Sequence, residues 1–182
     1  MPNSVSSLAI FDLDNTLLAG DSDHAWGEFL CANGHVDAQK HQRLNNQFYQ
    51  AYCDGDLDIN AYLQFALSAI AGKTPAELSQ LHADFMQQFI KPMRLKRADA
   101  LLQQHRDNGD FLLIITATND FITAPIAEAL GVDDLIASKA EIINGVYTGK
   151  SIGIPCFQSG KVERLKQWLS NRNFSLETAY FY

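Results

Sequence analysis

The sequence predicts an α/β fold: a doubly wound, Rossmann-like parallel sheet with an all-helical cap inserted after the first strand. Two short apolar runs, residues 8–11 and 111–115, are typical of strands buried on both faces of a parallel sheet. From residue 92 onward helical patterns alternate with such runs, which favours a sheet covered by helices on both faces. Between about residues 20 and 90 the apolar residues recur only at helical spacing, so this block is predicted to be an insertion.

These patterns divide the chain into two predicted parts. Residues 1–19 and 92–182 form the α/β core, and residues 20–91 form the helical cap domain. A length of 182 residues is enough for one well-packed domain that carries a sizeable insertion. The hydrophobic content of 47% with 19% charged residues is that of an ordinary globular chain and argues against disorder.

Four helices are expected in the cap. They run from a cap near Asp21 to Gly34, over 37–52, over 59–70, and from Thr74 onward. The last has the strongest start signal, because Thr74 supplies an N-cap hydroxyl, Pro75 suits the first helical position and Glu77 completes a capping box. The dipeptide Lys91-Pro92 is expected to end the helical block, since proline disfavours a continuing helix.

The remaining elements of the core follow the cap. They are, in order, a helix around 98–105 that stops near Gly109, the strand 111–115, a helix from Asp120 or Phe121 to Gly131, a short strand 135–137, a helix opened by Ser159, and a strand over 178–182. Residues 141–148 contain Asn144-Gly145, a dipeptide typical of a two-residue β-hairpin turn. A hairpin is therefore expected between the third strand and the last helix.

Composition disfavours several classes of partner. The net charge of −7 and the pI near 5.1 make a nucleic-acid backbone or an anionic membrane surface a poor main partner. The three cysteines are far apart, so neither a disulfide framework nor a thiolate zinc site is expected. The N-terminus lacks the basic and apolar regions of a signal peptide, and no apolar run approaches the roughly 20 residues that span a bilayer. We expect a cytoplasmic protein with neither nucleic acid nor membrane as a partner.

Polar side chains gather where the first two predicted strands end. Asp12 and Asp14 follow the first strand, and Thr116, Thr118 and Asn119 end the second. In doubly wound sheets ligands bind outside the carboxyl ends of the strands, so these side chains are candidates for one site. Two carboxylates crowded at the end of a buried strand repel each other and lose solvation. Such a pair usually persists where a cation, a phosphate site or a reaction requires it.

Three motifs, in this order, resemble those of the haloacid dehalogenase (HAD) superfamily. Asp12-Leu13-Asp14-Asn15-Thr16 resembles its D-x-D-x-T signature, the apolar strand ending in Thr116 resembles its second motif, and Gly160-Lys161 before an amphipathic helix resembles its third. The helical insertion and the hairpin resemble the branch with a type-one cap that contains phosphoserine phosphatase and some histidinol-phosphate phosphatases. The resemblance covers essentially all of the chain.

The resemblance implies a phosphomonoester hydrolase that acts on a small phosphorylated metabolite, such as the phosphate of an amino acid or an amino alcohol. Asp12 would attack phosphorus and form an aspartyl-phosphate, and Asp14 would act first as general acid and then as general base. Thr116 would donate a hydrogen bond to a phosphoryl oxygen, and Lys161 would neutralise charge between Asp12 and the phosphate.

Substrate contacts are predicted at Asp21, Thr118 and Asn119. Asp21 lies nine residues after Asp12, where the phosphoserine phosphatase branch carries an acidic residue that faces the substrate amine. A helix N-cap role for Asp21 or Asp23 is equally open.

Several alternatives also stay open. Thr118 is the rival of Thr116 at the same strand end, and Lys150 is the fallback for Lys161. A phosphotransferase would use the same aspartyl-phosphate, and a catalytically impaired phosphate-binding module would keep the fold without turnover. A receiver-type signalling domain is disfavoured, because receivers place their acceptor aspartate after an internal strand and carry no helical insertion.

The resemblance also implies Mg²⁺, held by the Asp12 carboxylate and the backbone carbonyl of Asp14. The family's fourth motif places a pair of acidic residues just after a strand like 179–182, and the chain ends where those residues would begin. We therefore expect a core truncated at its C-terminus that binds Mg²⁺ weakly and turns over poorly, whereas a longer form would be active.

Overall fold

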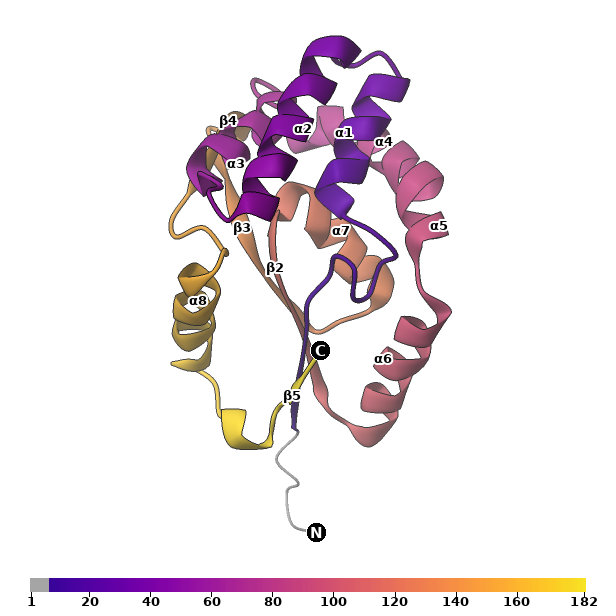
Figure 1. Ribbon diagram of the computed structural model, residues 1–182. Helices are drawn as coiled ribbons and strands as arrows, with labels where there is room; N and C mark the ends of the chain where they lie inside the picture. Colours follow the sequence, from indigo (N-terminus) through magenta and orange to yellow (C-terminus); the bar gives the residue numbers. More distant parts are fainter. Residues whose placement is uncertain (1–6) are drawn as a thin grey trace.

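A computed structural model describes residues 7–182, so the first six residues of the predicted core segment 1–19 lie outside the described part (Figure 1). The elements, in chain order, are β1 (Leu8–Phe11), α1 (Ser22–Ala32), α2 (Ala38–Asp54), α3 (Ile59–Ser68), α4 (Pro75–Phe85), a π-helical segment (Met86–Ile90), α5 (Lys91–Met93), α6 (Lys96–Asn108), β2 (Phe111–Asn119), α7 (Asp120–Leu130), β3 (Asp134–Ile143), β4 (Val146–Ile152), α8 (Ser159–Leu169), a 3₁₀ turn (Leu176–Thr178) and β5 (Tyr180–Phe181). No helix among these residues is long and apolar enough to cross a membrane.

The five strands form one sheet in the order β4-β3-β2-β1-β5. The neighbours β1 and β2, β2 and β3, and β1 and β5 are parallel, and only the hairpin partner β4 is antiparallel. The predicted α/β fold is therefore confirmed. Phe11 at the end of β1 lies level with Ile114, so β2 extends beyond β1 at the carboxyl edge. This offset brings the later residues of β2 beside the loop that follows β1.

Alternate residues of the strands belong to two apolar clusters, one on each face of the sheet. Ala9 and Phe11 of β1 belong to the larger cluster, which includes side chains of α6, α7 and the cap helices. Leu8 and Ile10 point to the other face, where α8 covers the smaller cluster. Figure 1 shows α8 on one side of the sheet and α6 on the other. Both faces are thus covered, as the continuous apolar runs predicted.

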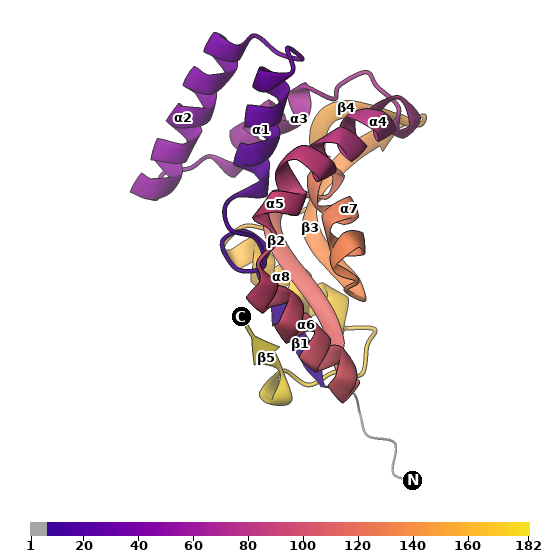
Figure 2. The ribbon, with the colours of Figure 1, turned by 90° about the vertical axis from the view of Figure 1, so that its right-hand side faces the viewer.

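The inserted segment is helical, and its α1 and α2 project from the sheet as an antiparallel pair (Figure 2). The first cap helix is nevertheless packed against the core, because Trp26 of α1 is only 2% exposed and its ring lies 5.3 Å from that of Phe121 in α7. The two parts share one apolar cluster at this point. The boundaries 20–91 of the cap stay a prediction.

Several local signals of the sequence are confirmed. The Thr74 hydroxyl accepts from the Glu77 amide and the Glu77 carboxylate accepts from the Thr74 amide, so the capping box forms. Asn144 and Gly145 have φ of 53° and 80°, the conformation of a type I′ hairpin turn. The helical block ends within one residue of the predicted Lys91-Pro92, because α5 closes at Met93 and Arg94 is extended; a π-helical segment, Met86–Ile90, precedes it. The fixed φ of proline is compatible with a last helical turn.

The cap is attached to the hairpin through its own backbone. The Gly72 amide donates to the Tyr147 carbonyl at 2.8 Å, and the Tyr147 amide donates to the Lys73 carbonyl at 2.9 Å. Next to this pairing Gly149 of β4 packs against Ala71, leaving no room for a side chain. The hairpin therefore supports the turn between α3 and α4.

Replacing Gly149 with Ala should destabilise the protein more than replacing Gly145 with Ala. Both glycines have φ of +80°, so each change forces an L residue into left-handed backbone, which costs about 1–2 kcal/mol. Only at Gly149 would the new Cβ also meet the cap, 2.8 Å from the Ala71 Cβ. Such overpacking adds about 1–3 kcal/mol, and thermal unfolding should show about 2–4 °C of extra loss per kcal/mol. Equal losses of Tm in the two variants would contradict the cap–hairpin contact.

Candidate active site

Asp12 and Asp14 lie in the loop that follows β1 at the carboxyl edge of the sheet. The carbonyl of Leu13 accepts from the amides of Leu17 and Leu18 at 2.9 and 3.1 Å, so the chain turns sharply after β1. Asn15 has φ of 58°, a left-handed conformation that asparagine tolerates better than most residues. The turn holds the two carboxylates near the end of β2 instead of letting the strand continue.

Lys161 reaches Asp12 from a point 149 residues further along the chain. Its Nζ donates to Asp12 Oδ1 at 3.1 Å, and the same oxygen accepts from the Leu13 amide at 3.0 Å. Lys161 lies in the first turn of α8, and the preceding Gly160 is buried. A Cβ on Gly160 would collide with the Pro155 carbonyl oxygen, so only glycine lets α8 begin this close to the sheet. The ammonium and carboxylate are both partly exposed and can reach a ligand.

Asp14 is more enclosed, and both of its oxygens are engaged. Oδ1 accepts from the Ser22 amide at 2.7 Å, and Oδ2 accepts from the Thr118 hydroxyl at 2.9 Å. Burial, and next the charge of Asp21, raise the pKa of Asp14 to about 6, although hydrogen bonds from Ser22 and Thr118 oppose the shift. A carboxyl group with such a pKa can both hold and release a proton near neutral pH.

The structure brings Thr116 and Thr118 to the same carboxylate. The Thr116 hydroxyl lies 3.4 Å from Asp14 Oδ2, a longer contact than that of Thr118, and it also accepts from the Thr118 amide at 3.3 Å. Asn119 is placed differently, because its Oδ1 accepts from the Ile122 amide and caps α7. Its amide nitrogen is buried without a hydrogen-bond partner among residues 7–182.

Asp21, the predicted substrate contact, is the N-cap of α1. Its Oδ1 accepts from the His24 amide at 2.8 Å, and the residue is exposed. Asp23 does not cap the helix but is buried in its first turn, with 6% exposure. Burial, and next the charge of Asp21, raise the pKa of Asp23 to about 7. No motif of the sequence marks Asp23 as a site residue, although its spacing of three from the apolar Trp26 indicates an inward-facing position.

The structure also separates Lys150 from Lys161 and shows which residues could hold Mg²⁺. Lys150 is exposed on β4, so Lys161 and not Lys150 forms the ion pair with Asp12. Asp12 and Asp14 offer oxygen ligands only, which suits Mg²⁺, an ion that proteins often hold by one or two carboxylates together with waters and a phosphate. No larger group of His, Cys, Asp or Glu side chains with metal-site geometry occurs within residues 7–182. The residues present fit that mode of binding.

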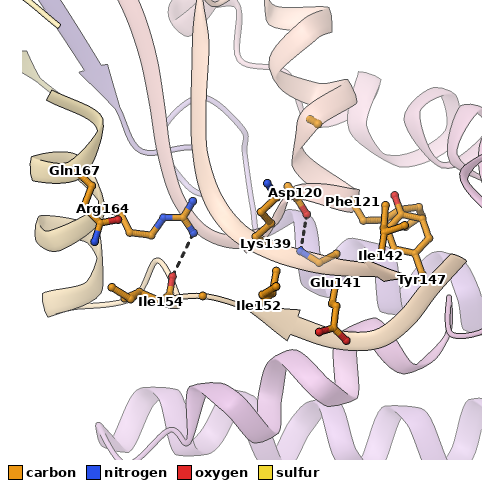
Figure 3. Close-up of a pocket in the computed structure, with 13 residues that line it drawn as sticks. Asp120, Phe121, Lys139, Glu141, Ile142, Tyr147, Ile152, Ile154, Arg164 and Gln167 are labelled. Atoms are coloured by element: carbon orange, nitrogen blue, oxygen red, sulfur yellow. Dashed lines mark hydrogen bonds between the residues drawn. The ribbon is translucent and has the colours of Figure 1, made fainter. Parts of the chain in front are cut away.

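A cavity of about 620 Å³ lies elsewhere, between the hairpin, the start of α7 and the later part of α8 (Figure 3). Arg164 and Asp120 line this cavity, and each is hydrogen-bonded to the backbone. Arg164 donates to the Ile154 carbonyl at 3.2 Å, and Asp120 accepts from the Ala140 amide at 2.8 Å. Neither Asp12, Asp14 nor Lys161 lines this cavity. The candidate active site is therefore defined by its side chains and not by the cavity.

Comparisons with known proteins agree on one family. A family model for haloacid dehalogenase-like hydrolase matches residues 9–182. The chain is 41% identical over 182 residues to a histidinol-phosphatase of Neisseria meningitidis serogroup C (strain 8013), covering 98% of this chain and 82% of that protein.

Solved structures give the same result for the fold. A crystal structure of a protein with unknown function from Bordetella pertussis Tohama I matches with a TM-score of 0.89 and 39% identity, covering 98% of this chain and 82% of that one. A phospho-aspartyl intermediate analogue of phosphoserine phosphatase matches with a TM-score of 0.67 and 17% identity, covering 97% of this chain and 77% of that one. At 17% identity the likeness is one of fold alone.

The burial of Asp23 predicts a particular dependence of stability on pH. Its ordinary pKa is 3.8 and its pKa in the folded protein is about 7, so between these values the folded state keeps a proton that the unfolded state has released. The free energy of unfolding should therefore fall as pH rises from about 4 to about 7 and stay low above that range. Asp23→Asn removes this titration, so the variant should lose less stability with pH and exceed the wild type at about pH 8.

Urea unfolding at about pH 4.5 and about pH 8 measures this difference directly. Asp14 titrates in part of the same range, so the variant keeps part of the decline. Identical slopes in the variant and the wild type would contradict a buried Asp23.

Proposed function

The chain belongs to the haloacid dehalogenase-like hydrolase family, and we propose that it hydrolyses a small phosphomonoester through an aspartyl-phosphate on Asp12. The observation that carries this proposal is the pairing of Asp12 with Lys161 across 149 residues, beside an enclosed Asp14. A nucleophile, a cation and a proton carrier are the three groups that such a reaction needs. The Neisseria relative is named a histidinol-phosphatase, and this name supports a small phosphorylated metabolite as substrate.

In the first step the Asp12 carboxylate attacks phosphorus in line with the leaving alcohol. The bond from phosphorus to the alcohol oxygen breaks as the bond to an Asp12 oxygen forms. Asp14, in its protonated form, gives its proton to the departing oxygen, so that a neutral alcohol leaves. A pKa near 6 lets Asp14 hold that proton at nearly neutral pH, and an approaching phosphate would raise it further.

In the second step the same Asp14, now a carboxylate, takes a proton from water as the water oxygen attacks phosphorus. The bond from phosphorus to Asp12 breaks, inorganic phosphate leaves, and the free Asp12 carboxylate is restored. Thr118 and the Ser22 amide hold Asp14 in place through both steps, because they occupy one oxygen each. Proton donation and return therefore come from one positioned group.

Lys161 and a threonine complete the site. The Lys161 ammonium neutralises charge that would otherwise repel a phosphate from Asp12. The Thr118 hydroxyl gives its one hydrogen to Asp14 at 2.9 Å, so Thr116, whose contact with Asp14 is longer at 3.4 Å, is the freer donor to a phosphoryl oxygen. Asp12 and the Asp14 backbone would hold Mg²⁺, which when bound supplies positive charge to the phosphoryl oxygens.

Asp12→Asn should reduce phosphate release by at least about a thousandfold, since it removes the nucleophile and keeps the size of the side chain. The assay is a screen of phosphomonoesters with Mg²⁺, read as inorganic phosphate. Asp133→Asn is a matched control, because Asp133 is a carboxylate that bonds the Leu112 amide at the opposite edge of β2. Activity retained by Asp12→Asn would refute the aspartyl-phosphate. A panel of alcohols added to the same assay would detect transfer to an acceptor in place of hydrolysis.

Thr116→Val should lower kcat by about a hundredfold, because it removes the donor to the phosphoryl oxygen, and Thr118→Val by less than about tenfold, because the Ser22 amide still holds Asp14. Both changes replace a hydroxyl by a methyl group of similar size, and both sites are buried, so folding effects are matched. Only the Thr118 change removes the short hydrogen bond to Asp14. Steady-state kinetics on the best substrate of the screen compares the two, and the reverse order would assign the phosphoryl donor to Thr118.

A further inference from the structure

The β3–β4 hairpin is irregular where it borders the cavity of about 620 Å³. The pairing of the two strands shifts register between Ala140 and Ile142, and such a bulge bends a strand and interrupts its ladder of hydrogen bonds. Beside the bulge the Ala140 amide donates to Asp120 Oδ1 at 2.8 Å. Asp120 is the first residue of α7, so this bond joins the hairpin to α7 at the wall of the cavity.

Three charged side chains line the cavity without forming an ion pair. They are Asp120 of α7, Lys139 of β3 and Arg164 of α8, and none of the ion pairs within residues 7–182 includes any of them. Burial raises the pKa of Asp120 and outweighs the Ala140 amide and the charges of Lys139 and Arg164, which lower it. The two cations of the cavity therefore do not fully compensate the partly buried carboxylate.

Two of these groups keep hydrogen-bonding capacity for a ligand. Arg164 donates from Nη1 to the Ile154 carbonyl at 3.2 Å, which leaves Nη2 of the guanidinium for a carboxylate. Asp120 uses Oδ1 for the hairpin backbone, which leaves Oδ2 for a donor. Figure 3 shows Arg164 reaching from α8 toward Lys139 and Asp120. A ligand with one anionic and one cationic group would therefore find a partner for each.

Much of the remaining wall of the cavity is apolar. Ile142 and Ile152 line it and are 47% and 51% exposed, so both lack an apolar cover. The rings of Phe121 and Tyr147 lie 5.4 Å apart in an edge-to-face arrangement and also line the cavity. Sites for small molecules typically combine such apolar surface with a few polar groups, in a volume of this order. The cavity offers both kinds of contact.

From this arrangement we infer that the cavity is a second ligand site, which binds an apolar α-amino acid. The carboxylate of the ligand lies at Arg164 and Lys139, its ammonium lies at Asp120, and its side chain covers Ile142 and Ile152. The inference does not rest on the proposed function, because the groups proposed for catalysis do not line this cavity.

A ligand with a single charge suits the cavity less well. A simple anion such as inorganic phosphate would be repelled by Asp120, and a simple cation would be repelled by Lys139 and Arg164. The fourth charged side chain of the lining, Glu141, is already engaged, because it accepts from the Thr148 hydroxyl at 2.7 Å. The balance of charges in the lining favours a zwitterion.

Isothermal titration calorimetry of the full chain with L-phenylalanine and L-leucine tests the inference. At least one of them should bind with a dissociation constant in the millimolar range or below. Analogues remove one charged group at a time: hydrocinnamate and isocaproate lack the ammonium of phenylalanine and leucine, and phenethylamine and isoamylamine lack the carboxylate. Each analogue should bind at least about tenfold more weakly than its parent amino acid.

Asp120→Asn and Arg164→Gln should each weaken binding of the amino acid by at least about tenfold, because each removes one charge of the site. Only Arg164→Gln should also weaken binding of the carboxylate analogue. Glu128→Gln and Lys166→Gln are the matched controls, since they remove exposed charges of the same signs from the same helices outside the cavity. They should change the affinity by less than about twofold. Circular dichroism checks the fold, and either site variant carries the test if the other is unfolded.

Asp12→Asn should bind the amino acid as the wild type does, because the ligand lies away from the proposed nucleophile. Binding of neither amino acid, equal binding of the carboxylate analogue, binding kept in both Asp120→Asn and Arg164→Gln, or binding lost in Asp12→Asn would overturn the second site. None of these results depends on phosphate release, so the proposed function is tested separately by the phosphomonoester screen.

Discussion

The carboxylate of Asp14 holds together three parts of the chain that are distant in sequence. It belongs to the loop after β1, it accepts from the Ser22 amide at the start of the cap, and it accepts from Thr118 at the end of β2, 104 residues away. Burying a carboxylate is unfavourable unless its oxygens are hydrogen-bonded. Asp14 can therefore be buried here only because both the Ser22 amide and the Thr118 hydroxyl are in place. These hydrogen bonds fix where the cap starts relative to the sheet, and the burial that they make possible raises the pKa of Asp14.

The fold could be predicted because its signals are local. The capping box at Thr74 and the Asn144-Gly145 turn depend on backbone requirements that a few neighbouring residues express, and both formed as expected. The apolar runs predicted strands covered on both faces for the same reason. The helical block ended at Met93, one residue after Pro92, because proline removes a hydrogen bond and fixes φ but is compatible with a last helical turn.

The candidate site was predictable to the extent that strand ends define it. Asp12 follows the carboxyl end of the parallel strand β1, and Lys161 reaches it from the first turn of α8, which follows the antiparallel strand β4. The choice between Thr116 and Thr118 was beyond the sequence, since a period of two puts both on the same face of β2, and only the distances to Asp14 separate them. The burial of Asp23 could not be read from the chain around it, because a residue of another helix, Tyr62, faces it.

The charges around the site differ between its core side and its cap side. On the core side Lys161 lies against Asp12, so an anion is accepted there with the help of a cation. On the cap side the charge of Asp21 acts on Asp14 and Asp23, and the charge of Asp14 also acts on Asp23. A phosphate would be repelled from this second region, most strongly where water is excluded, so the ion pair of Lys161 with Asp12 marks the part of the site where an anion can bind.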